Sequence, residues 1–371
     1  MKIVIPKSDL LDAVNKVKTV VSAKSALPIL SHILFETGES SIRLSATDLK
    51  VSIECTVDCG VEKEGSLTVS SQRISSILSE LPESDITLEL EESNVVRLQC
   101  GKIHTKLYSM SPEEFPPVRN FDGIEPLILP QKLLANIFQR TSFAICTDQA
   151  RYNLTGLLIE IKNGILTAVA TDGRRMSLVK QSEGIVDGID IKVIIPNKMI
   201  HELERLLDDE GDVDILISEN QAGFSFGSLR LVTALIEGTF PNYEMVVPKS
   251  HDKEAIVSTA VFIEAIRRTR TMTNDKFNSV RLQINEGTMK LLVSTPEVGE
   301  YEEDLPLEYS GEELEIAFNP DFVLDVLKRI DTEKSKLVLK DSMSPGVIQP
   351  TSSESDGEGS EYVNVVMPIR I

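Results

Sequence analysis

The sequence predicts an α+β protein of three repeated domains, each with antiparallel sheets backed by two helices. Three observations lead to this prediction. A short pattern recurs around Thr47, Thr171 and Thr295, which are separated by 124 residues in each case (171 − 47 and 295 − 171). Alternating apolar residues, typical of strands, fill most of each repeat. The helical patterns are too few to cover both faces of a parallel sheet.

Each copy of the repeat has a threonine in the middle of a predicted strand region. The copies are Leu44-Ser45-Ala46-Thr47-Asp48-Leu49-Lys50-Val51, Val169-Ala170-Thr171-Asp172-Gly173-Arg174-Arg175-Met176 and Leu292-Val293-Ser294-Thr295-Pro296-Glu297-Val298. The same offset places residues 33–36 on residues 157–160. A fixed period indicates repeated structural units. We therefore expect domains at residues 1–122, 123–250 and 251–371, in keeping with a usual domain size of about 100–200 residues.

The first repeat begins with a strand at residues 1–7. Ser8 and Asp9 are expected to cap a helix, because apolar residues follow at three- and four-residue spacing from Leu10 to Val21. Alternation then predicts strands at residues 28–36, 41–57 and 67–69, a second helix at 72–81, and strands at 86–90 and 95–110. The prolines of Phe115-Pro116-Pro117 end the sheet.

The second repeat has the same order of elements. We expect a strand at 126–129, a helix from 130 to 141, and strands at 152–161 and 165–180 with Asp172-Gly173 as a turn signal. A strand at 192–195 leads to Asn197, which is expected to cap a helix that continues to Leu207. Strands at 213–218 and 224–237 complete the unit, and Phe240-Pro241-Asn242-Tyr243 closes it.

The third repeat opens with a strand at 254–258 and a helix that carries Phe262, Ile263 and Ile266. A strand is expected at 281–284, and Asn319-Pro320 is expected to start the second helix. Residues 351–360 are too polar to pack and predict a mobile hairpin loop before a final strand at 362–371.

Composition narrows the possible functions. The chain has 58 acidic and 38 basic residues, a net charge of −20, so contact with nucleic acid requires a local basic surface. Cys55, Cys59, Cys100 and Cys146 have no zinc-site spacing and are expected to be free thiols. The N-terminus does not resemble a signal peptide, and no apolar run approaches the ~20 residues of a membrane span. We expect a soluble, cytoplasmic protein.

Basic residues gather on the predicted helices despite the acidic whole. They are Lys16, Lys18, Lys132, Arg140, Lys198, Arg205, Arg267, Arg268, Arg270, Lys328 and Arg329. Cations of this kind bind phosphates without reading sequence. The alternative is that each is part of an ordinary solvated helix face. Their recurrence on most of the helices favours a surface that faces DNA.

Together, the three units and four motifs resemble the bacterial DNA polymerase III β sliding clamps. The motifs are Ala170-Thr171-Asp172-Gly173-Arg174-Arg175-Met176, Phe240-Pro241-Asn242-Tyr243, Phe318-Asn319-Pro320 and the terminal Val366-Met367-Pro368-Ile369-Arg370-Ile371. The resemblance implies clamp-type domains and a head-to-tail homodimeric ring that encircles duplex DNA non-specifically. It also implies a processivity factor for the replicative DNA polymerase, opened and closed by a clamp loader and shared with other DNA replication and repair proteins. No catalysis, cofactor, metal or membrane is expected.

The resemblance also implies a pocket for partner peptides between the second and third domains. Its residues would be Arg151, Leu154, Thr171, Gly173, Arg174, Arg175, Met176, Pro241, Val246, Asn319, Phe322, Met343, Val365, Val366, Met367, Pro368, Ile369, Arg370 and Ile371. Methionine and aliphatic groups suit a site for several different peptides. The alternative is a strand end packed into its own core. The sequence departs from the common family pattern at Arg174, Phe322 and Met245, where histidine, tyrosine and a basic residue are frequent.

Two further sets of residues are expected at surfaces. By resemblance, Lys24, Gln149 and Tyr152 would contact DNA, and Leu107 and Met272 would support the dimer interface. The predicted edge strands at 97–108 and 297–304 carry opposite charge, with Lys102 and Lys106 on one and Glu300 and Glu302 on the other. Opposite charges favour pairing of these edges between two chains. The alternative is two solvated strands.

Two other functions compete with a sliding clamp. An enzyme is disfavoured because the four histidines share no motif and neither a Gly-rich phosphate loop nor a nucleophile elbow is present in the sequence. A β-rich scaffold that binds proteins without encircling DNA would explain the repeat and the apolar terminus. It leaves the basic helices unexplained.

Overall fold

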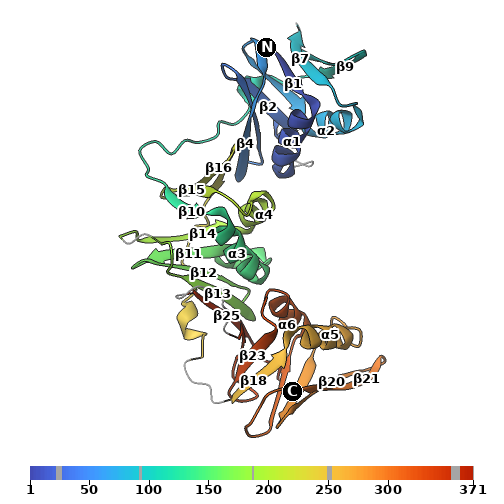
Figure 1. Cartoon of the computed structure of the whole chain (residues 1–371), viewed down its shortest axis with the longest axis vertical. Helices are drawn as coiled ribbons and strands as arrows, with labels where there is room; N and C mark the ends of the chain where they lie inside the picture. The colour runs from blue at the N-terminus through green and yellow to red at the C-terminus, as the bar shows by residue number, and fades with distance from the viewer. Residues whose placement is uncertain (22–26, 92–93, 186–187, 249–252, 352–359, 371) are drawn as a thin grey trace. The chain divides into compact units, whose positions relative to one another are not determined.

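The computed structural model describes residues 1–21, 27–91, 94–185, 188–248, 253–351 and 360–370 (Figure 1). The chain forms two compact units, one of residues 1–134 with 201–235 and the other of residues 135–200 with 236–371. The central third of the chain is therefore shared between the units. The predicted boundaries of three sequence domains are a different division and stay a prediction.

The first unit contains two sheets in which the described neighbouring strands pair antiparallel. The five-stranded sheet has the order β5 (Gly60–Lys63), β1 (Lys2–Pro6), β7 (Asp85–Glu91), β8 (Val95–Cys100), β9 (Ile103–Tyr108). The eight-stranded sheet has the order β10 (Leu127–Pro130), β15 (Asp212–Ile217), β16 (Gln221–Phe226), β17 (Leu229–Ala234), β4 (Val51–Asp58), β3 (Ser41–Thr47), β2 (His32–Thr37), β6 (Ser66–Ser70).

The second unit is also built from antiparallel sheets. Its eight-stranded sheet has the order β14 (Ile191–Pro196), β11 (Gly156–Lys162), β12 (Ile165–Thr171), β13 (Arg175–Gln181), β25 (Ser360–Val366), β24 (Gly346–Pro350), β23 (Lys334–Leu339), β18 (Lys253–Ser258). The four-stranded sheet has the order β21 (Gly299–Pro306), β20 (Thr288–Thr295), β19 (Val280–Asn285), β22 (Leu314–Phe318).

The α-helices of the described residues have the predicted amphipathic pattern. They are α1 (Lys7–Val17), α2 (Ser71–Glu80), α3 (Gln131–Thr141), α4 (Asn197–Leu206), α5 (Thr259–Arg270) and α6 (Pro320–Leu327). Helix α1 packs on α2 and buries Leu10, Val14 and Val17, and α5 packs on α6 (Figure 1). The 3₁₀ turns are η1 (Lys18–Val20), η2 (Pro28–Ser31), η4 (Pro112–Glu114), η5 (Ser142–Ala144), η6 (Gln149–Leu154) and η7 (Tyr243–Met245). The predicted α+β class is confirmed.

In each unit, the eight-stranded sheet combines strands of two successive repeats, and these strands pair in the same way. Strand β17 pairs with β4 at Thr233 and Val51, and β25 pairs with β13 at Val366 and Arg175. One residue further on, the Ala234 N–H donates to the Lys50 oxygen at 3.2 Å, and the Met367 N–H donates to the Arg174 oxygen at 2.9 Å. The 124-residue repeat is therefore also a repeat of strand pairing.

Several predicted strands are hairpins. The stretches 41–57, 95–110 and 224–237 were each expected as one strand, but each turns back on itself. Apolar alternation continues on both sides of a tight turn, so the pattern alone does not show the reversal. Gly101 and Gly227, which both have φ of 54°, provide the left-handed backbone that two of these turns need.

Two predicted helix caps are wrong and one is confirmed. Helix α1 begins at Lys7 after Pro6, so Ser8 and Asp9 lie within its first turn and make no cap. Asn197 is the first residue of α4, and its side-chain oxygen is buried without a hydrogen-bond partner. Asn319 does cap α6, because its side chain accepts a hydrogen bond from the Asp321 N–H at 2.8 Å. The loop predicted at 351–360 lies mostly outside the described residues.

Candidate functional site

The turn between β12 and β13 is fixed by the side chains of Thr171 and Asp172. The Thr171 hydroxyl donates to the Arg175 oxygen at 2.7 Å and accepts from the Gly173 N–H at 3.0 Å. One carboxylate oxygen of Asp172 accepts from the N–H groups of Arg174 and Arg175 at 2.8 and 3.0 Å. Gly173 has a φ of 81°, which glycine adopts without a steric penalty. The recurring sequence motif is thus a rigid turn.

The first repeat contains the same turn. The Thr47 hydroxyl donates to the Val51 oxygen at 3.1 Å and accepts from the Leu49 N–H at 3.0 Å. Asp48 accepts from the N–H groups of Lys50 and Val51 at 2.9 and 2.7 Å. In the third repeat the turn is one residue shorter, because Thr295 pairs with Gly299 whereas Thr171 pairs with Met176. The Thr295 hydroxyl is buried without a hydrogen-bond partner.

Arg175 ties this turn to helix α6. Its Nη1 lies 2.6 Å from Asp325 Oδ2, its Nε lies 3.1 Å from Asp172 Oδ2, and its Nη2 donates to the Phe143 oxygen at 2.8 Å. The guanidinium also lies over the ring of Phe322, with its carbon 4.7 Å from the ring centroid. A planar guanidinium can make these contacts at once, whereas an ammonium cannot.

A cavity of about 480 Å³ lies beside the turn, wholly within the second unit. It is lined by Thr171, Gly173, Arg174, Arg175, Met176, Met245, Val246, Pro248, Lys340, Ser344, Pro345, Val365 and Met367. Its floor, Met176 and Val365, belongs to a buried apolar cluster that also contains Leu154, Phe240 and Tyr243. The volume and the apolar lining suit a small molecule or a few side chains of a peptide.

The structure brings together part of the predicted pocket. Thr171, Gly173, Arg174, Arg175, Met176, Val246, Val365 and Met367 all line the cavity. Leu154 lies in the apolar cluster below it, and the Arg151 side chain donates to the Asp172 oxygen. Val365 is only 1% exposed, so it both packs in the core and forms the cavity floor.

Other predicted pocket residues do not line this cavity. They are Arg151, Leu154, Pro241, Asn319, Phe322, Met343, Val366, Pro368, Ile369 and Arg370. Val366 is fully buried, Met343 is 56% exposed, and the Ile369 N–H donates to the Ala317 oxygen at 2.8 Å. Ile371 lies outside the described residues.

The cavity lining also includes Pro248, Lys340, Ser344 and Pro345, which the predicted pocket lacks, and Met245, which the sequence singles out only as a departure from the family pattern. Three of them, Lys340, Ser344 and Pro345, belong to the turn that follows β23, where the Asp341 carboxylate accepts from the N–H groups of Met343 and Ser344. The prediction of Met343 pointed to this turn. The Met343 side chain faces solvent, whereas the next residues, Ser344 and Pro345, line the cavity. Sequence composition does not show which residue of a turn points into a cavity.

The predicted DNA-facing residues differ in the contacts that their side chains make. Lys16, Arg205, Arg268 and Arg270 form ion pairs with Asp12, Glu202, Glu303 and Asp321 at 2.7, 3.0, 2.5 and 2.5 Å. Lys132, Arg267 and Lys328 are exposed and form no ion pair with the residues that the structure describes. The remaining side chains are Lys18, which donates to Ser75, and the exposed Gln149, Tyr152 and Lys198. Lys24 lies outside the described residues.

Arg140 is a correction. It was expected to face DNA, but it is 6% exposed and its Nη2 lies 3.2 Å from Asp331 Oδ2. Its guanidinium also lies over the ring of Tyr362, 5.1 Å from the centroid. Burial raises the pKa of Tyr362 to about 12, so this hydroxyl stays protonated at neutral pH. Arg140 therefore lies on the packed face of α3, and its partners Asp331 and Tyr362 both come from the third repeat.

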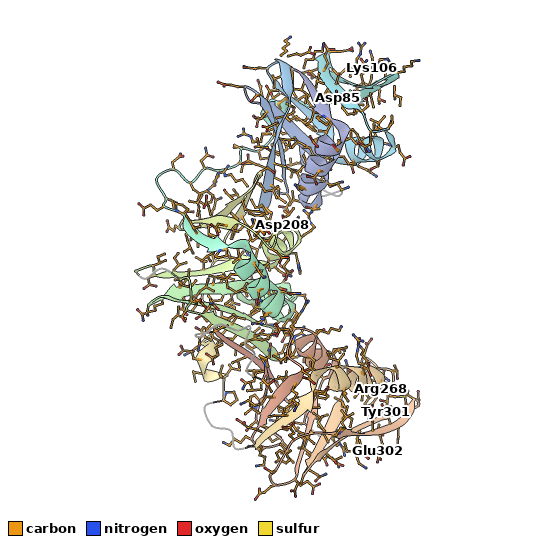
Figure 2. All side chains as sticks on the ribbon, in the orientation of Figure 1. Asp85, Lys106, Asp208, Arg268, Tyr301 and Glu302 are labelled. Atoms are coloured by element: carbon orange, nitrogen blue, oxygen red, sulfur yellow. The ribbon has the colours of Figure 1, made fainter. Side chains whose placement is uncertain are left out.

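Both predicted charged edges are edge strands of their sheets. Strand β9 is the last strand of the five-stranded sheet and carries Lys106 (Figure 2). Lys102 lies in the turn that precedes it. Strand β21 is the first strand of the four-stranded sheet and carries Glu300 and Glu302. Met272 packs against its first residue, Gly299, and Leu107 of β9 is half-buried. Each edge therefore offers unpaired backbone groups.

The acidic edge is supported from helix α5. Arg268 Nη2 donates to Glu303 Oε1 at 2.5 Å, and the Tyr301 hydroxyl donates to the same carboxylate. The Arg268 guanidinium holds the pKa of Glu303 below its ordinary value. The edge strand stays negatively charged at neutral pH.

The described residues hold no metal-binding cluster and no helix that could span a membrane. They contain no cluster of three or more His, Cys, Asp or Glu side chains placed to hold a metal ion. None of their helices is both long enough and apolar enough to cross a membrane. The four cysteines form no disulfide, and Cys55, Cys100 and Cys146 are buried.

The sequence matches models of the DNA polymerase III beta subunit along nearly its whole length. The N-terminal domain model matches residues 1–119, the central domain model residues 128–242 and the C-terminal domain model residues 244–370. A beta sliding clamp of Pseudomonas putida is 34% identical over 374 residues, covering 100% of both chains. One of Chlamydia muridarum is 31% identical over 371 residues, covering 100% of this chain and 99% of the other. The structure of a Pseudomonas aeruginosa sliding clamp bound to griselimycin is 32% identical, with a TM-score of 0.94 and coverage of 100% of both chains.

Proposed function

Because the chain belongs to the DNA polymerase III beta subunit family, we propose that it is a DNA sliding clamp, a homodimeric ring that encircles duplex DNA and tethers the replicative DNA polymerase. One observation carries the proposal most directly: the three domain models match in order and without overlap along the chain. The alternative of a scaffold that does not encircle DNA is not favoured, because it leaves these matches to a DNA polymerase subunit unexplained.

The proposal also covers the partners of the clamp, the absence of catalysis, its cellular location and its domain boundaries. The clamp acts without catalysis, cofactor or metal, and a clamp loader opens and closes it. Other replication and repair proteins dock on the same ring. It works in the cytoplasm, and its sequence domains are residues 1–122, 123–250 and 251–371.

The electrostatics support a ring that holds DNA by enclosing it. The net charge is −20, and Lys16, Arg205, Arg268 and Arg270 are already paired with acids. Few cations such as Lys132, Arg267 and Lys328 are left for phosphates, and each phosphate contact weakens with salt. A closed ring needs little affinity, because the DNA cannot leave without ring opening or a free end.

Pairing of β9 with β21 of a second chain would close the ring. The two edges carry opposite charge, which favours a head-to-tail contact and disfavours contact between like edges. Lys102 and Glu300 form no ion pair with described residues of their own chain, so both are available to a partner.

The cavity would take the apolar part of a partner peptide. Its methionines, Met176, Met245 and Met367, can repack around different side chains at low cost. The lining includes Arg174 and Lys340 but no acidic residue, so a carboxylate on the peptide would be favoured.

Retention on DNA of different topology tests the proposal. The protein is loaded with a bacterial clamp loader onto nicked circular DNA, washed in high salt and assayed before and after the circle is cut. We expect retention on the circle and release after cutting, with linear DNA of the same length as the matched control. Equal retention on both forms, or on neither, overturns the proposed function.

A further inference from the structure

One wall of the cavity comes from the short segment of residues 242–248. Met245 is 81% exposed and Val246 is 39% exposed, so burial of these side chains does not hold the wall in place. The turn η7 (Tyr243–Met245) shapes the segment: the Val246 N–H donates to the Tyr243 oxygen at 3.0 Å, and the Asn242 side chain accepts from the Glu244 N–H at 3.1 Å. Val247 packs against the buried cluster below the cavity, and Tyr243 anchors the turn that carries Met245 and Val246.

Tyr243 is anchored on the large sheet by both its ring and its hydroxyl. Its ring is 8% exposed and belongs to the same buried cluster as the cavity floor, Met176 and Val365. Its hydroxyl donates to Glu160 Oε2 at 2.9 Å, and the other oxygen of Glu160 accepts from Lys192 Nζ at 2.9 Å. Neither Glu160 nor Tyr243 lines the cavity.

Strand register explains why these polar groups lie at the border of the apolar cluster. Glu160 of β11 pairs with Thr167 of β12 and with Lys192 of β14. Two residues earlier on the same face, Leu158 pairs with Val169 and Ile194, and all three belong to the cluster. Side chains two apart share a face of a sheet, so the apolar row passes directly into a polar row. Tyr243 spans the two rows.

The protonation states suit this hydrogen bond. Burial and the nearby Glu160 carboxylate raise the pKa of Tyr243, so its hydroxyl remains a donor. Burial alone would raise the pKa of Glu160, but hydrogen bonds from Lys192 and Tyr243 lower it below its ordinary value. A hydrogen bond to an ionised acceptor is roughly twice as strong as one between neutral groups.

We propose that Glu160 and Tyr243 are positioning residues for the cavity: their hydrogen bond fixes the Met245 and Val246 wall over the Met176 and Val365 floor and so sets the affinity for a bound ligand. This inference rests on the proposed function, because it takes the cavity as the docking site for partner peptides. It extends that function to residues that do not touch the ligand.

The test measures binding of griselimycin, the ligand in the related Pseudomonas aeruginosa structure, to the full-length protein by calorimetry. Tyr243→Phe keeps the ring and removes the hydroxyl, so we expect affinity to fall about tenfold, the size of one lost hydrogen bond to a charged group. Glu160→Ala should have the same effect, and the double variant should lose no more. Glu160→Gln keeps a neutral acceptor, which forms a weaker hydrogen bond, so its affinity should lie between those of the parent and Glu160→Ala.

A matched control separates positioning from general stability. Tyr309→Phe removes a hydroxyl that donates to the Glu312 oxygen at 2.6 Å in the same unit but outside the cavity lining. It should leave griselimycin affinity unchanged. Amide hydrogen exchange gives a second measurement: Tyr243→Phe should speed exchange at Val246 and leave β19 as in the parent.

The outcomes distinguish the two proposals. If the parent binds griselimycin and Tyr243→Phe binds it equally well, the positioning role alone is wrong. The same holds if Tyr309→Phe loses as much affinity, or if exchange at Val246 does not change. If the parent binds neither griselimycin nor a polymerase-derived peptide, the docking function of the cavity fails and the positioning role fails with it.

Discussion

Arg175 and Asp325 lie 150 residues apart in the chain and form an ion pair of 2.6 Å between Nη1 and Oδ2. This contact joins strand β13, at the turn beside the cavity, to helix α6. The Arg175 side chain is only 12% exposed, whereas that of Asp325 is 38% exposed. Because Arg175 also donates to Asp172 and to the Phe143 oxygen, its loss leaves more groups without a hydrogen bond than the loss of Asp325 does.

We predict that Arg175→Ala destabilises the protein by about 2–4 kcal/mol, because Asp172, Asp325 and the Phe143 oxygen all lose a donor. Asp325→Ala should cost less, about 1–2 kcal/mol, since Arg175 keeps its other partners. Urea unfolding measures both. Lys180→Ala breaks the exposed pair with Glu361 and is the control, with an expected cost below about 1 kcal/mol. Equal midpoints for Arg175→Ala and Lys180→Ala would contradict this account.

Leu49 offers a stabilising change. It has a φ of 75° and is 58% exposed, and it occupies the turn position that Gly173 holds in the second repeat. A non-glycine residue in this left-handed region costs about 1–2 kcal/mol. Glycine removes this strain, but it loses more conformational entropy on folding than leucine does, which offsets part of the gain. We therefore predict that Leu49→Gly raises the free energy of unfolding by about 0.5–1 kcal/mol.

The control for this prediction is Ile128→Gly. Ile128 is 53% exposed and lies in strand β10, outside the group of described positive-φ residues. Glycine should destabilise the protein there. A loss of stability for Leu49→Gly as well would show that the leucine side chain has contacts in solution that outweigh its backbone strain.

The proposed dimer contact predicts unequal effects of charge reversal. Lys106 already pairs with Glu91 at 3.2 Å, and Glu302 pairs with Lys290 in its own sheet. Lys102 and Glu300 should therefore contribute more to the interface. We expect Lys102→Glu to weaken the dimer about tenfold, as the combined effect of one lost attraction and one new repulsion of about 0–1 kcal/mol each.

Sedimentation of mixed chains measures this effect. Lys102→Glu with Lys106→Glu on one chain should be compensated by Glu300→Lys with Glu302→Lys on the other, so that only the mixture dimerises as the parent does. A Lys102→Glu chain that dimerises like the parent at low salt would refute the assignment of these edges.

The end of the chain should be needed for peptide binding but not for the oligomer. Met367 lines the cavity, and the Ile369 N–H bond to the Ala317 oxygen holds the chain that follows it. We predict that removing residues 368–371 abolishes binding of polymerase-derived peptides, while Met367→Ala weakens it about tenfold through lost apolar contact. Fluorescence anisotropy with a labelled peptide measures both, and sedimentation shows whether the oligomer is intact. Unchanged affinity in the truncated protein would remove the terminus from the site.

The sequence predicted the local structure well where the physical cause is local. Thr171, Asp172 and Gly173 specify their turn because a hydroxyl, a carboxylate and a glycine satisfy it within five residues. The same chemistry at Thr47 and Asp48 made the repeat visible. Resemblance to a family then pointed to part of the cavity, since Met176 and Met367 belong to the motifs and Val365 directly precedes one.

Only the tertiary structure decided how the repeats share their sheets and which charged groups are buried. The pairing of β13 with β25, the burial of Arg140 over Tyr362, and the bond from Tyr243 to Glu160 each join residues about 80 to 220 positions apart. Such contacts depend on which faces meet after the strands have paired, and hydrophobic periodicity reports only that a face exists. Local chemistry therefore fixed the turns, strands and helices, while long-range packing fixed the partners of each side chain.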